Sequence, residues 1–249
     1  MNIIGIIPSR FGSTRFPGKP LIDIGGMSMV ERVYRQAMTS DVFDLVVVAT
    51  DDKRIFDAVT LFGGKAVMTD SSHPSGTDRC AEVIAGIGDG FDAVVNIQGD
   101  EPFIHPGQIR LLTEAIAEEG AQIATLVKRI DDEEELFNPN QPKVVVSATG
   151  EALYFSRQAI PYVKSVEHNS WSGSHVFFKH IGIYAYRTDV LGEITRLPQG
   201  KLELAESLEQ LRWLEHGYRI RVRETPFETV AIDTPDDLGK ALQFLLSQD

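Results

Sequence analysis

The chain has 249 residues, enough for one α/β domain with a smaller lobe and a full hydrophobic core. Its 36 acidic residues outnumber its 24 Lys and Arg residues, and the formal net charge of −12 argues against duplex nucleic acid or an anionic membrane as the main partner. The single cysteine, Cys80, excludes an internal disulfide and a cysteine-rich metal site. The first residues lack the basic and apolar regions of a signal peptide, so we expect a cytoplasmic protein.

The first expected strand, Asn2–Ile7, leads into a loop that is rich in Gly, Ser and Pro and carries three cations, Arg10, Arg15 and Lys19. A parallel sheet offers such backbone amides and cationic side chains to a polyphosphate. The loop lacks the G-x-G-x-x-G dinucleotide motif, and Lys19 is followed by Pro20 where a Walker A loop needs Ser or Thr. It therefore predicts a triphosphate-binding loop of another type; the alternative is a surface loop whose cations are merely solvated.

Strand-like apolar runs alternate with helical patterns through the first half of the chain, which predicts a parallel sheet with right-handed crossovers. The expected strands are Asn2–Ile7, Leu45–Thr50, Lys65–Met68 and Ala93–Gln98. The expected helices are Met29–Met38, Arg54–Phe62, Asp78–Ile87 and Gln108–Glu118. Ligands of such sheets bind beyond the carboxyl ends of the strands, so we expect the segments Pro8–Lys19, Asp51-Asp52 and Gln98–Pro102 to meet at one crevice.

Carboxylates follow two of these strands. Asp100 comes directly after Ala93–Gln98, at the binding edge of the sheet. Because Mg²⁺ takes oxygen ligands from one or two carboxylates and from phosphates, Asp100 is a candidate ligand; the alternative is that Asp100 or Glu101 caps a turn before Pro102. Asp51 and Asp52, after the second strand, are better explained as N-caps of the next helix.

Two further segments each allow two interpretations. Ser75-Gly76-Thr77-Asp78-Arg79 opens a helix, and it could cap that helix or present its amides to a base or a ribose. Asp233 follows an expected last strand, Thr229–Ile232, and it could bind metal, cap the final helix Thr234–Ser247, or do both.

After about Ile130 the pattern changes, and the strands Val144–Ser147, Leu153–Ser156 and His180–Arg187 follow without long helices between them. We expect one domain, in which a parallel core (residues 1–130 and 226–249) carries a mixed extension with antiparallel pairs (about 131–225). A leucine stripe predicts a helix over 203–216, and the polar segment 163–176 is expected to be a mobile loop near a site.

The extension contains candidate binding residues. Arg157 could clamp a substrate carboxylate, and His180 and Tyr184 could bond hydroxyl groups. Taken singly, each is more simply explained as a surface or interface residue. Glu209 and Gln210 lie beside the leucine stripe and, on their own, predict only a solvated helix face.

The chain resembles the cytidylyltransferases that activate acidic sugars, and in particular the 3-deoxy-manno-octulosonate (Kdo) family. The resemblance runs in order along the chain and rests on six motifs, namely Pro8–Leu21, Gln98–Pro102, Ala152–Pro161, His180–Tyr184, Leu208–Arg212 and Ile232–Leu238. Ser9 and Phe16 depart from the Ala and Leu that are usual in the first motif, and neither change puts the chemistry in doubt.

This resemblance implies a Rossmann-like nucleotidyltransferase fold, a homodimer formed largely through the extension, CTP and Kdo as substrates, a place in lipopolysaccharide biosynthesis, and Mg²⁺ as cofactor. It also implies site residues by position. Triphosphate binding falls to Arg10, Ser13, Arg15 and Lys19; contact with cytidine or the sugar to Gln98, Ser75, Gly76, Thr77 and Arg79; metal binding to Asp100 and Asp233; and the sugar pocket to Arg157, His180, Tyr184, Glu209 and Gln210. Arg15, Lys19, Asp100 and Asp233 would carry the catalysis.

Three alternatives stay open at this point. The first is a cytidylyltransferase for another acidic sugar, such as a sialic acid or 8-amino-Kdo, which would share the loop and the metal ligands. The second is a nucleotide-binding regulator without turnover, which the intact cations and carboxylates disfavour. The third, a dehydrogenase, is disfavoured because the glycine motif is absent.

Overall fold

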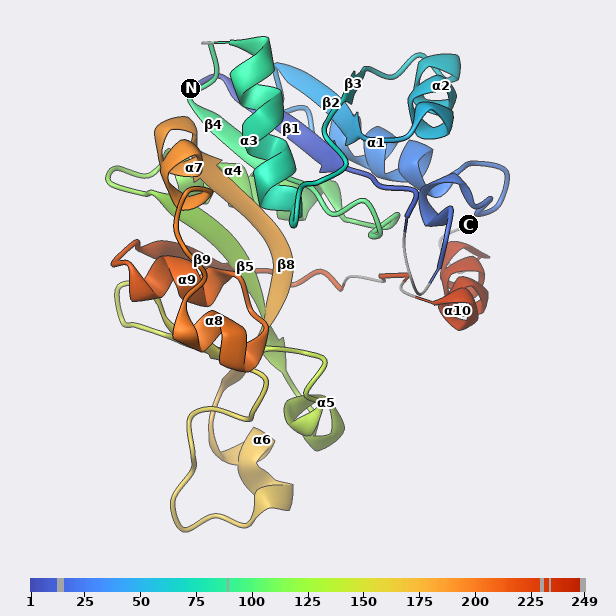
Figure 1. Cartoon of the computed structure of the whole chain (residues 1–249). Helices are drawn as coiled ribbons and strands as arrows, with labels where there is room; N and C mark the ends of the chain where they lie inside the picture. The colour runs from blue at the N-terminus through green and yellow to red at the C-terminus, as the bar shows by residue number, and fades with distance from the viewer. Residues whose placement is uncertain (13–15, 89, 229–230, 233, 247–249) are drawn as a thin grey trace. The chain divides into compact units, whose positions relative to one another are not determined.

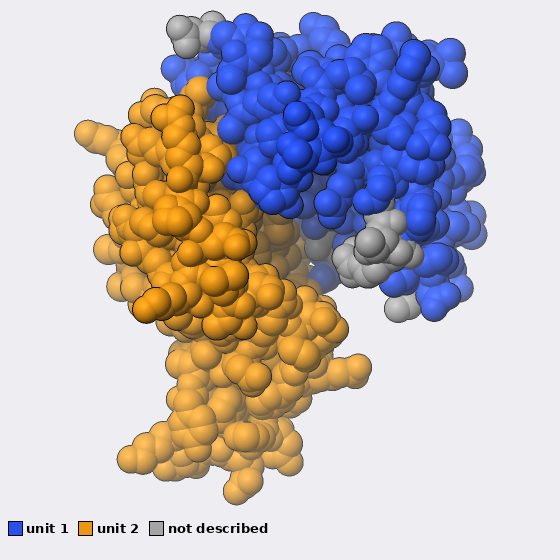
Figure 2. All heavy atoms as spheres, viewed as in Figure 1, with its two compact units in different colours: residues 1–113, 228–249 blue, residues 114–227 orange. Residues whose placement is uncertain are grey.

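The computed structural model describes residues 1–12, 16–88, 90–228, 231–232 and 234–246. The chain divides into two compact units, residues 1–113 with 228–249, and residues 114–227 (Figure 2). The sequence pattern placed the change from core to extension after residue 130, whereas the division falls before strand β5 (Ile123–Ile130). The reason is that β5 hydrogen-bonds to two strands of the second unit, β8 and β9.

The first unit is built on parallel strands in the order β3-β2-β1-β4 (Figure 1). These strands are β1 (Ile3–Pro8), β2 (Leu45–Thr50), β3 (Ala66–Met68) and β4 (Ala93–Asn96). β1 lies between β2 and β4, with Ile4 opposite both Leu45 and Val94. β1 and β4 are buried along almost their whole length, as expected for strands covered on both faces.

Helices follow the strands as the alternation predicts. They are α1 (Met29–Thr39), α2 (Lys53–Leu61), α3 (Gly76–Ile87), α4 (Pro106–Ala117) and α10 (Pro235–Leu246). Ser28, Asp52 and Ser75 cap α1, α2 and α3 by accepting hydrogen bonds from backbone amides, at distances of 3.3, 2.9 and 3.2 Å. The N-cap interpretation is therefore confirmed for Asp52 and wrong for Asp51. α3 packs on β1, β2 and β4 (Figure 1) and buries Cys80 fully.

The second unit contains the antiparallel pairs that the sequence predicted. β6 (Lys143–Val146) pairs with β7 (Ala152–Ser156) and with β8 (Phe177–Arg187). β8 in turn runs antiparallel to β5, and β5 pairs in parallel with β9 (Ile220–Glu224). β5 and β9 were not expected, because Lys128 and Arg129 in one strand and Arg221 and Arg223 in the other interrupt the apolar pattern.

The single helix expected over 203–216 is wrong. Two short helices, α8 (Lys201–Glu206) and α9 (Gln210–Glu215), are separated at Ser207, whose φ of 52° lies in the left-handed region. The break turns Leu204 outward, where 63% of its surface is exposed, while Leu211 is fully buried. The leucine stripe therefore does not form one continuous face. The remaining helices of this unit are α5 (Glu133–Phe137) and α7 (Thr188–Ile194).

The polar segment 163–176 is not an irregular loop throughout. It contains a 3₁₀ turn, His168–Ser170, and the short helix α6 (Trp171–Ser174). Trp171 is buried in a small cluster with Ile130, Leu136 and Phe177. One aromatic side chain thus gives this otherwise polar segment its own core.

The strand expected over Thr229–Ile232 begins at residues that lie outside the described part of the chain. Ile232 itself is fully buried beside Ile24, Met29 and Phe103. Its amide donates to the carbonyl oxygen of Asp100 at 3.0 Å. In the described residues no helix is long and apolar enough to span a membrane.

Candidate active site

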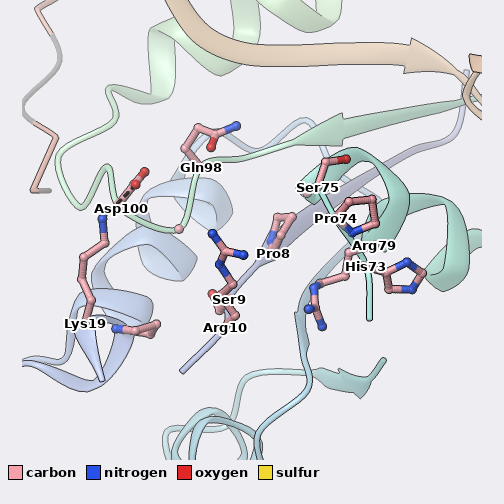
Figure 3. Close-up of a pocket in the computed structure, with 13 residues that line it drawn as sticks. Pro8, Ser9, Arg10, Lys19, His73, Pro74, Ser75, Arg79, Gln98 and Asp100 are labelled. Atoms are coloured by element: carbon pink, nitrogen blue, oxygen red, sulfur yellow. Dashed lines mark hydrogen bonds and ion pairs between the residues drawn. The ribbon is translucent and has the colours of Figure 1, made fainter. Parts of the chain in front are cut away.

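A pocket opens in the first unit at the carboxyl ends of β1 and β4 (Figure 3). β1 is the strand at which the chain order changes direction, since β2 lies on one side of it and β4 on the other, and such a position is where open α/β sheets bind ligands. Three segments line the pocket, residues 8–10 with 19–20, residues 73–76 with Arg79, and residues 98–100. The expected meeting of strand ends is thereby confirmed for the segments after β1 and β4, whereas Asp51 and Asp52, after β2, are not among the lining residues.

Lys19 reaches the pocket from a single 3₁₀ turn, Lys19–Leu21. Gly18 precedes the turn with φ of 74°, a conformation that favours glycine, and its amide donates to the carbonyl of Phe11 at 3.0 Å. Lys19 Nζ lies 2.9 Å from Asp100 Oδ2, and the lysine side chain is only 13% exposed. Arg10 lines the same pocket. Ser13 and Arg15 lie outside the described residues.

Asp100 belongs to a tight segment after β4. A Cβ at Gly99 would lie 2.7 Å from the carbonyl oxygen of Pro8, so only glycine lets this segment approach the end of β1. Glu101, the next residue, is buried, and burial together with the Asp100 charge raises its pKa to about 8. One carboxyl group therefore faces the pocket while its neighbour is held uncharged in the core at neutral pH.

The capping role predicted for the segment at the start of α3 is confirmed, since Ser75 caps the helix; Ser75 also lines the pocket, and contact with a base or a ribose stays a prediction. Arg79 is 3% exposed and donates to Thr69 Oγ1 and, at 3.3 Å, to Asp51 Oδ2. Asp51 is thus a partner of Arg79. The Arg79 guanidinium is fixed by these two groups at the wall of the pocket.

Metal binding would have to use few protein ligands. Among the residues that the structure describes, no group of three or more His, Cys, Asp and Glu side chains could hold a metal ion. Asp100 is the carboxylate that lines the pocket, and Asp233 lies outside the described residues. A site with one or two carboxylates, completed by phosphate oxygens and water, is the kind that Mg²⁺ uses and most other metals do not.

His180 and Tyr184 lie together in the second unit, with ring centroids 5.2 Å apart. His180 Nε2 is 3.0 Å from Thr125 Oγ1, which itself donates to the carbonyl of Ile183, so the imidazole donates to the hydroxyl. Desolvation lowers the pKa of His180 to about 3, and the ring is neutral at physiological pH.

The Tyr184 hydroxyl is buried and interacts with the Thr125 side chain, but it makes no hydrogen bond of good geometry within the described part of the chain. Burial raises its pKa well above the usual value, and the negative charge of Glu209 raises it further. A buried polar atom without a partner is costly in a folded protein, and such atoms commonly serve a ligand.

Arg157 contacts the break between α8 and α9. Its guanidinium donates to the carbonyl oxygens of Glu206, Ser207 and Pro139 at 2.7, 3.2 and 3.0 Å. Gln210 begins α9 and is 5% exposed. Arg157 therefore lies beside the segment that leads to Glu209 and Gln210, and its guanidinium is hydrogen-bonded to the backbone of that segment. Gln98, by contrast, lies in the first unit and lines the pocket there.

Comparison of the sequence with known proteins identifies the family of this chain. The cytidylyltransferase family model matches residues 4–220. The 3-deoxy-manno-octulosonate cytidylyltransferase of Parabacteroides distasonis is 59% identical, with all of both chains covered, and that of Cytophaga hutchinsonii is 56% identical over 96% of this chain and 95% of its own. This chain belongs to the 3-deoxy-manno-octulosonate cytidylyltransferase family.

A solved structure supports the family at the level of the fold. The structure of CMP:2-keto-3-deoxy-manno-octonic acid synthetase in complex with CTP is 41% identical, covers both chains completely and has a TM-score of 0.93. A putative glucose-1-phosphate thymidylyltransferase from Bacillus anthracis, 19% identical with a TM-score of 0.65, shares the fold alone. The expected Rossmann-like nucleotidyltransferase fold is therefore confirmed for this cytidylyltransferase.

Two residues at the cytidylyltransferase pocket were not found from the sequence. His73 lines the cavity, and Glu101, which follows the lining residue Asp100 in the chain, is buried. For Glu101 the sequence predicts only a turn cap before Pro102. His73 stands two residues before the Ser75 cap, and that position in a loop leading into a helix at the strand ends is the signal that could have pointed to it.

Proposed function

We propose that this cytidylyltransferase transfers CMP from CTP to the anomeric hydroxyl of Kdo, giving CMP-Kdo and pyrophosphate for lipopolysaccharide biosynthesis. The observation that carries the proposal is the pocket at the ends of β1 and β4, where Arg10, Lys19 and Asp100 face one cavity in a chain of this family. A polyphosphate fits this combination of cations, backbone amides and one carboxylate.

The reaction is phosphoryl-group transfer, in which position and charge matter more than a covalent nucleophile. The anomeric oxygen of Kdo attacks the α-phosphorus of CTP in line, the bond to the β-phosphate oxygen breaks, and pyrophosphate leaves. Lys19 and Arg10, together with Arg15, neutralise the charge that develops on the leaving pyrophosphate. The ion pair with Asp100 keeps Lys19 Nζ at the cavity before the nucleotide arrives.

Asp100 and Asp233 would hold Mg²⁺, which when bound offsets the repulsion between the Kdo carboxylate and the phosphates and lowers the pKa of the attacking hydroxyl. The donor chemistry of Asp100 at the pocket fits this ion. Magnesium dependence is thus part of the proposal, and we expect a chelator to abolish turnover and added Mg²⁺ to restore it.

For the sugar, we propose recognition by His180, Tyr184, Glu209 and Gln210. The buried Tyr184 hydroxyl, which lacks a hydrogen bond of good geometry, and the neutral His180 ring suit the hydroxyl groups of a sugar. The sequence predicts that Arg157 clamps the sugar carboxylate, but its guanidinium donates instead to the backbone that leads to Glu209. We therefore assign it to positioning the sugar-binding residues.

We also propose a cytoplasmic homodimer formed largely through the second unit. Leu153 on β7 and Tyr162, which are 61% and 71% exposed, are the apolar surface that supports this part of the proposal. Light scattering tests it: a mass near twice 27.6 kDa is expected, and a monomer at micromolar concentration would contradict it.

The substrate assignment is tested by pyrophosphate release over a grid of four nucleoside triphosphates and three acidic sugars, namely Kdo, 8-amino-Kdo and a sialic acid. We expect the combination of CTP with Kdo to dominate the grid. Faster turnover of either other sugar would mean that this sugar is the substrate. Absence of pyrophosphate release from every combination would support a non-catalytic regulator.

A further inference from the structure

His73 and Glu82 form a pair at one wall of the pocket. His73 Nε2 lies 2.5 Å from Glu82 Oε2, and the same carboxylate oxygen accepts the backbone amide of Asp70 at 2.9 Å. Asp70 in turn accepts the amide of Ser72 at 2.7 Å. One oxygen of a helix side chain therefore holds both ends of the turn over residues 70–73. His73 lines the pocket, whereas Glu82 is not among the lining residues.

A second contact fixes the same segment one helical turn earlier. Arg79 lies three residues before Glu82 and hence on the same side of α3, and it binds Thr69 and Asp51. Thr69 also donates its amide to the carbonyl of Thr50 at 2.8 Å. The chain thus enters the turn directly after β3, and the hydrogen bond from Thr69 to the last residue of β2 fixes its position.

The exit from the turn is fixed as well. Ser75 Oγ donates to Asp78 Oδ2 at 2.6 Å and accepts the Asp78 amide at 3.2 Å. A Cβ at Gly76 would lie 3.4 Å from Pro8, so the segment packs directly on the end of β1. Residues 73–76 are therefore a rigid wall of the pocket, and His73 is the wall residue that Glu82 holds.

Figure 3 places this wall within the cavity. His73, Pro74 and Ser75 lie on one side, Lys19 and Asp100 lie on the other, and Arg10 lies between them. In the proposed function Lys19 binds the phosphates, so the wall faces the opposite half of the nucleotide, the ribose and the base.

The ionisation state of Glu82 favours its hydrogen bond with His73. Partial burial would raise the pKa of Glu82, but the hydrogen bonds from the Asp70 amide and from His73 outweigh it and lower the pKa below the usual value. Glu82 is thus a carboxylate at neutral pH, and Nε2 of His73 donates to it. In a neutral ring this leaves Nδ1 as the acceptor atom of His73.

We propose that the His73–Glu82 pair positions the 73–76 wall for the nucleoside half of the nucleotide. The inference rests on the proposed function, because it takes the pocket to bind CTP. Glu82 acts through His73 and is a positioning residue. Loss of the pair should therefore weaken the binding of every ligand that carries cytidine, and it should leave the binding of free pyrophosphate unchanged.

The test is calorimetric titration of the full chain with CTP, CMP and pyrophosphate. Glu82→Ala should raise the Kd of CTP and of CMP by the same factor, about tenfold for one lost charge-assisted hydrogen bond, and leave the Kd of pyrophosphate unchanged. Glu82→Gln keeps an acceptor oxygen and should fall between Ala and wild type. Glu31→Gln, which breaks an ion pair with Arg35 on α1, is the matched control and should bind as wild type does.

Each outcome separates the inference from the proposed function. If wild-type protein binds no CTP, the proposed function fails. If wild type binds CTP and Glu82→Ala binds CTP and CMP equally well, the inference is overturned, and it is overturned too if pyrophosphate weakens by the same factor as CTP. The ¹⁵N shifts of the His73 ring, assigned with His73→Gln, should change when CMP is added; unchanged shifts would mean that the pair serves only the fold.

Discussion

Lys19 and Asp100 meet inside the pocket although 80 residues of chain separate them, and their chemistry leads to the most direct prediction. Lys19→Ala should lower kcat/KM for CTP roughly a hundredfold, because one cation is lost where charge develops on pyrophosphate. Asp100→Ala should abolish nearly all turnover. Pyrophosphate release measures both, and near-UV circular dichroism checks that the fold persists.

Two results would contradict these assignments. Turnover of the Asp100→Ala variant at the wild-type rate would remove Asp100 from the reaction. CTP kinetics that are unchanged by Lys19→Ala would remove the cation loop from triphosphate binding.

Gly99 leads to a second prediction at a single position. In Gly99→Ala the new Cβ would meet the Pro8 carbonyl at 2.7 Å, and because that oxygen belongs to the backbone of β1, the Asp100 segment must move. We expect a loss of about 1–3 kcal/mol in the free energy of unfolding, together with weaker CTP binding. Gly86→Ala on α3, where nothing lies within 4 Å, is the control. If Gly99→Ala has the stability and the CTP affinity of the wild type, residue 99 does not lie as close to the Pro8 carbonyl as the structure indicates.

Among the elements, the α8–α9 pair depends on the break at Ser207. Arg212 on α9 binds Glu203 on α8 through two nitrogens, Nε at 2.7 Å and Nη2 at 2.5 Å, and both side chains are nearly buried. Arg157 also holds the break, because its guanidinium donates hydrogen bonds to the carbonyl oxygens of Glu206 and Ser207. These contacts place Glu209 and Gln210 at the start of α9.

Substitution at the break tests this arrangement. Ser207→Val should lower the free energy of unfolding by about 1–2 kcal/mol, because a β-branched residue tolerates the left-handed conformation poorly, whereas Ser207→Gly should be close to neutral. Kdo KM should rise in the Val variant while CTP KM stays constant. Equal stability of the Val and Gly variants would show that the backbone at this position relaxes freely.

The stability of the folded chain should depend on pH through His180. Its folded pKa of about 3 lies below the 6.5 of an ordinary histidine, so the unfolded chain takes up the proton first and stability falls as the pH drops below 6.5. From pH 7 to pH 5 we expect a loss of about 1–2 kcal/mol from this residue, allowing for its partial exposure.

Fluorescence is the suitable measurement. Both tryptophans, Trp171 and Trp213, belong to the second unit, as does His180, so denaturant unfolding followed by tryptophan emission reports on the unit concerned. The difference between wild type and His180→Gln should shrink from pH 7 to pH 5. A difference that is constant with pH would mean that His180 titrates normally.

Local chemistry made much of the fold and the pocket predictable. The alternation of apolar runs and helices predicted the parallel sheet, and the rule that strand ends share one edge predicted that the segments with Lys19 and Asp100 would meet. Capping by Asp52 followed from its place before a helical pattern. β5 and β9 escaped prediction, because their charged residues are accommodated by pairing partners far away in the chain.

The order of elements, the ligand edge of the sheet and the family resemblance are properties of the sequence alone, since they depend on local periodicity and on residues that follow one another. Which partner each polar group receives was decided only by the tertiary structure. The guanidinium of Arg157 binds backbone carbonyls, Arg79 binds Asp51 and Thr69, and Glu101 is buried uncharged. Those outcomes depend on distances between segments that are remote in the chain, and local pattern carries no information about them.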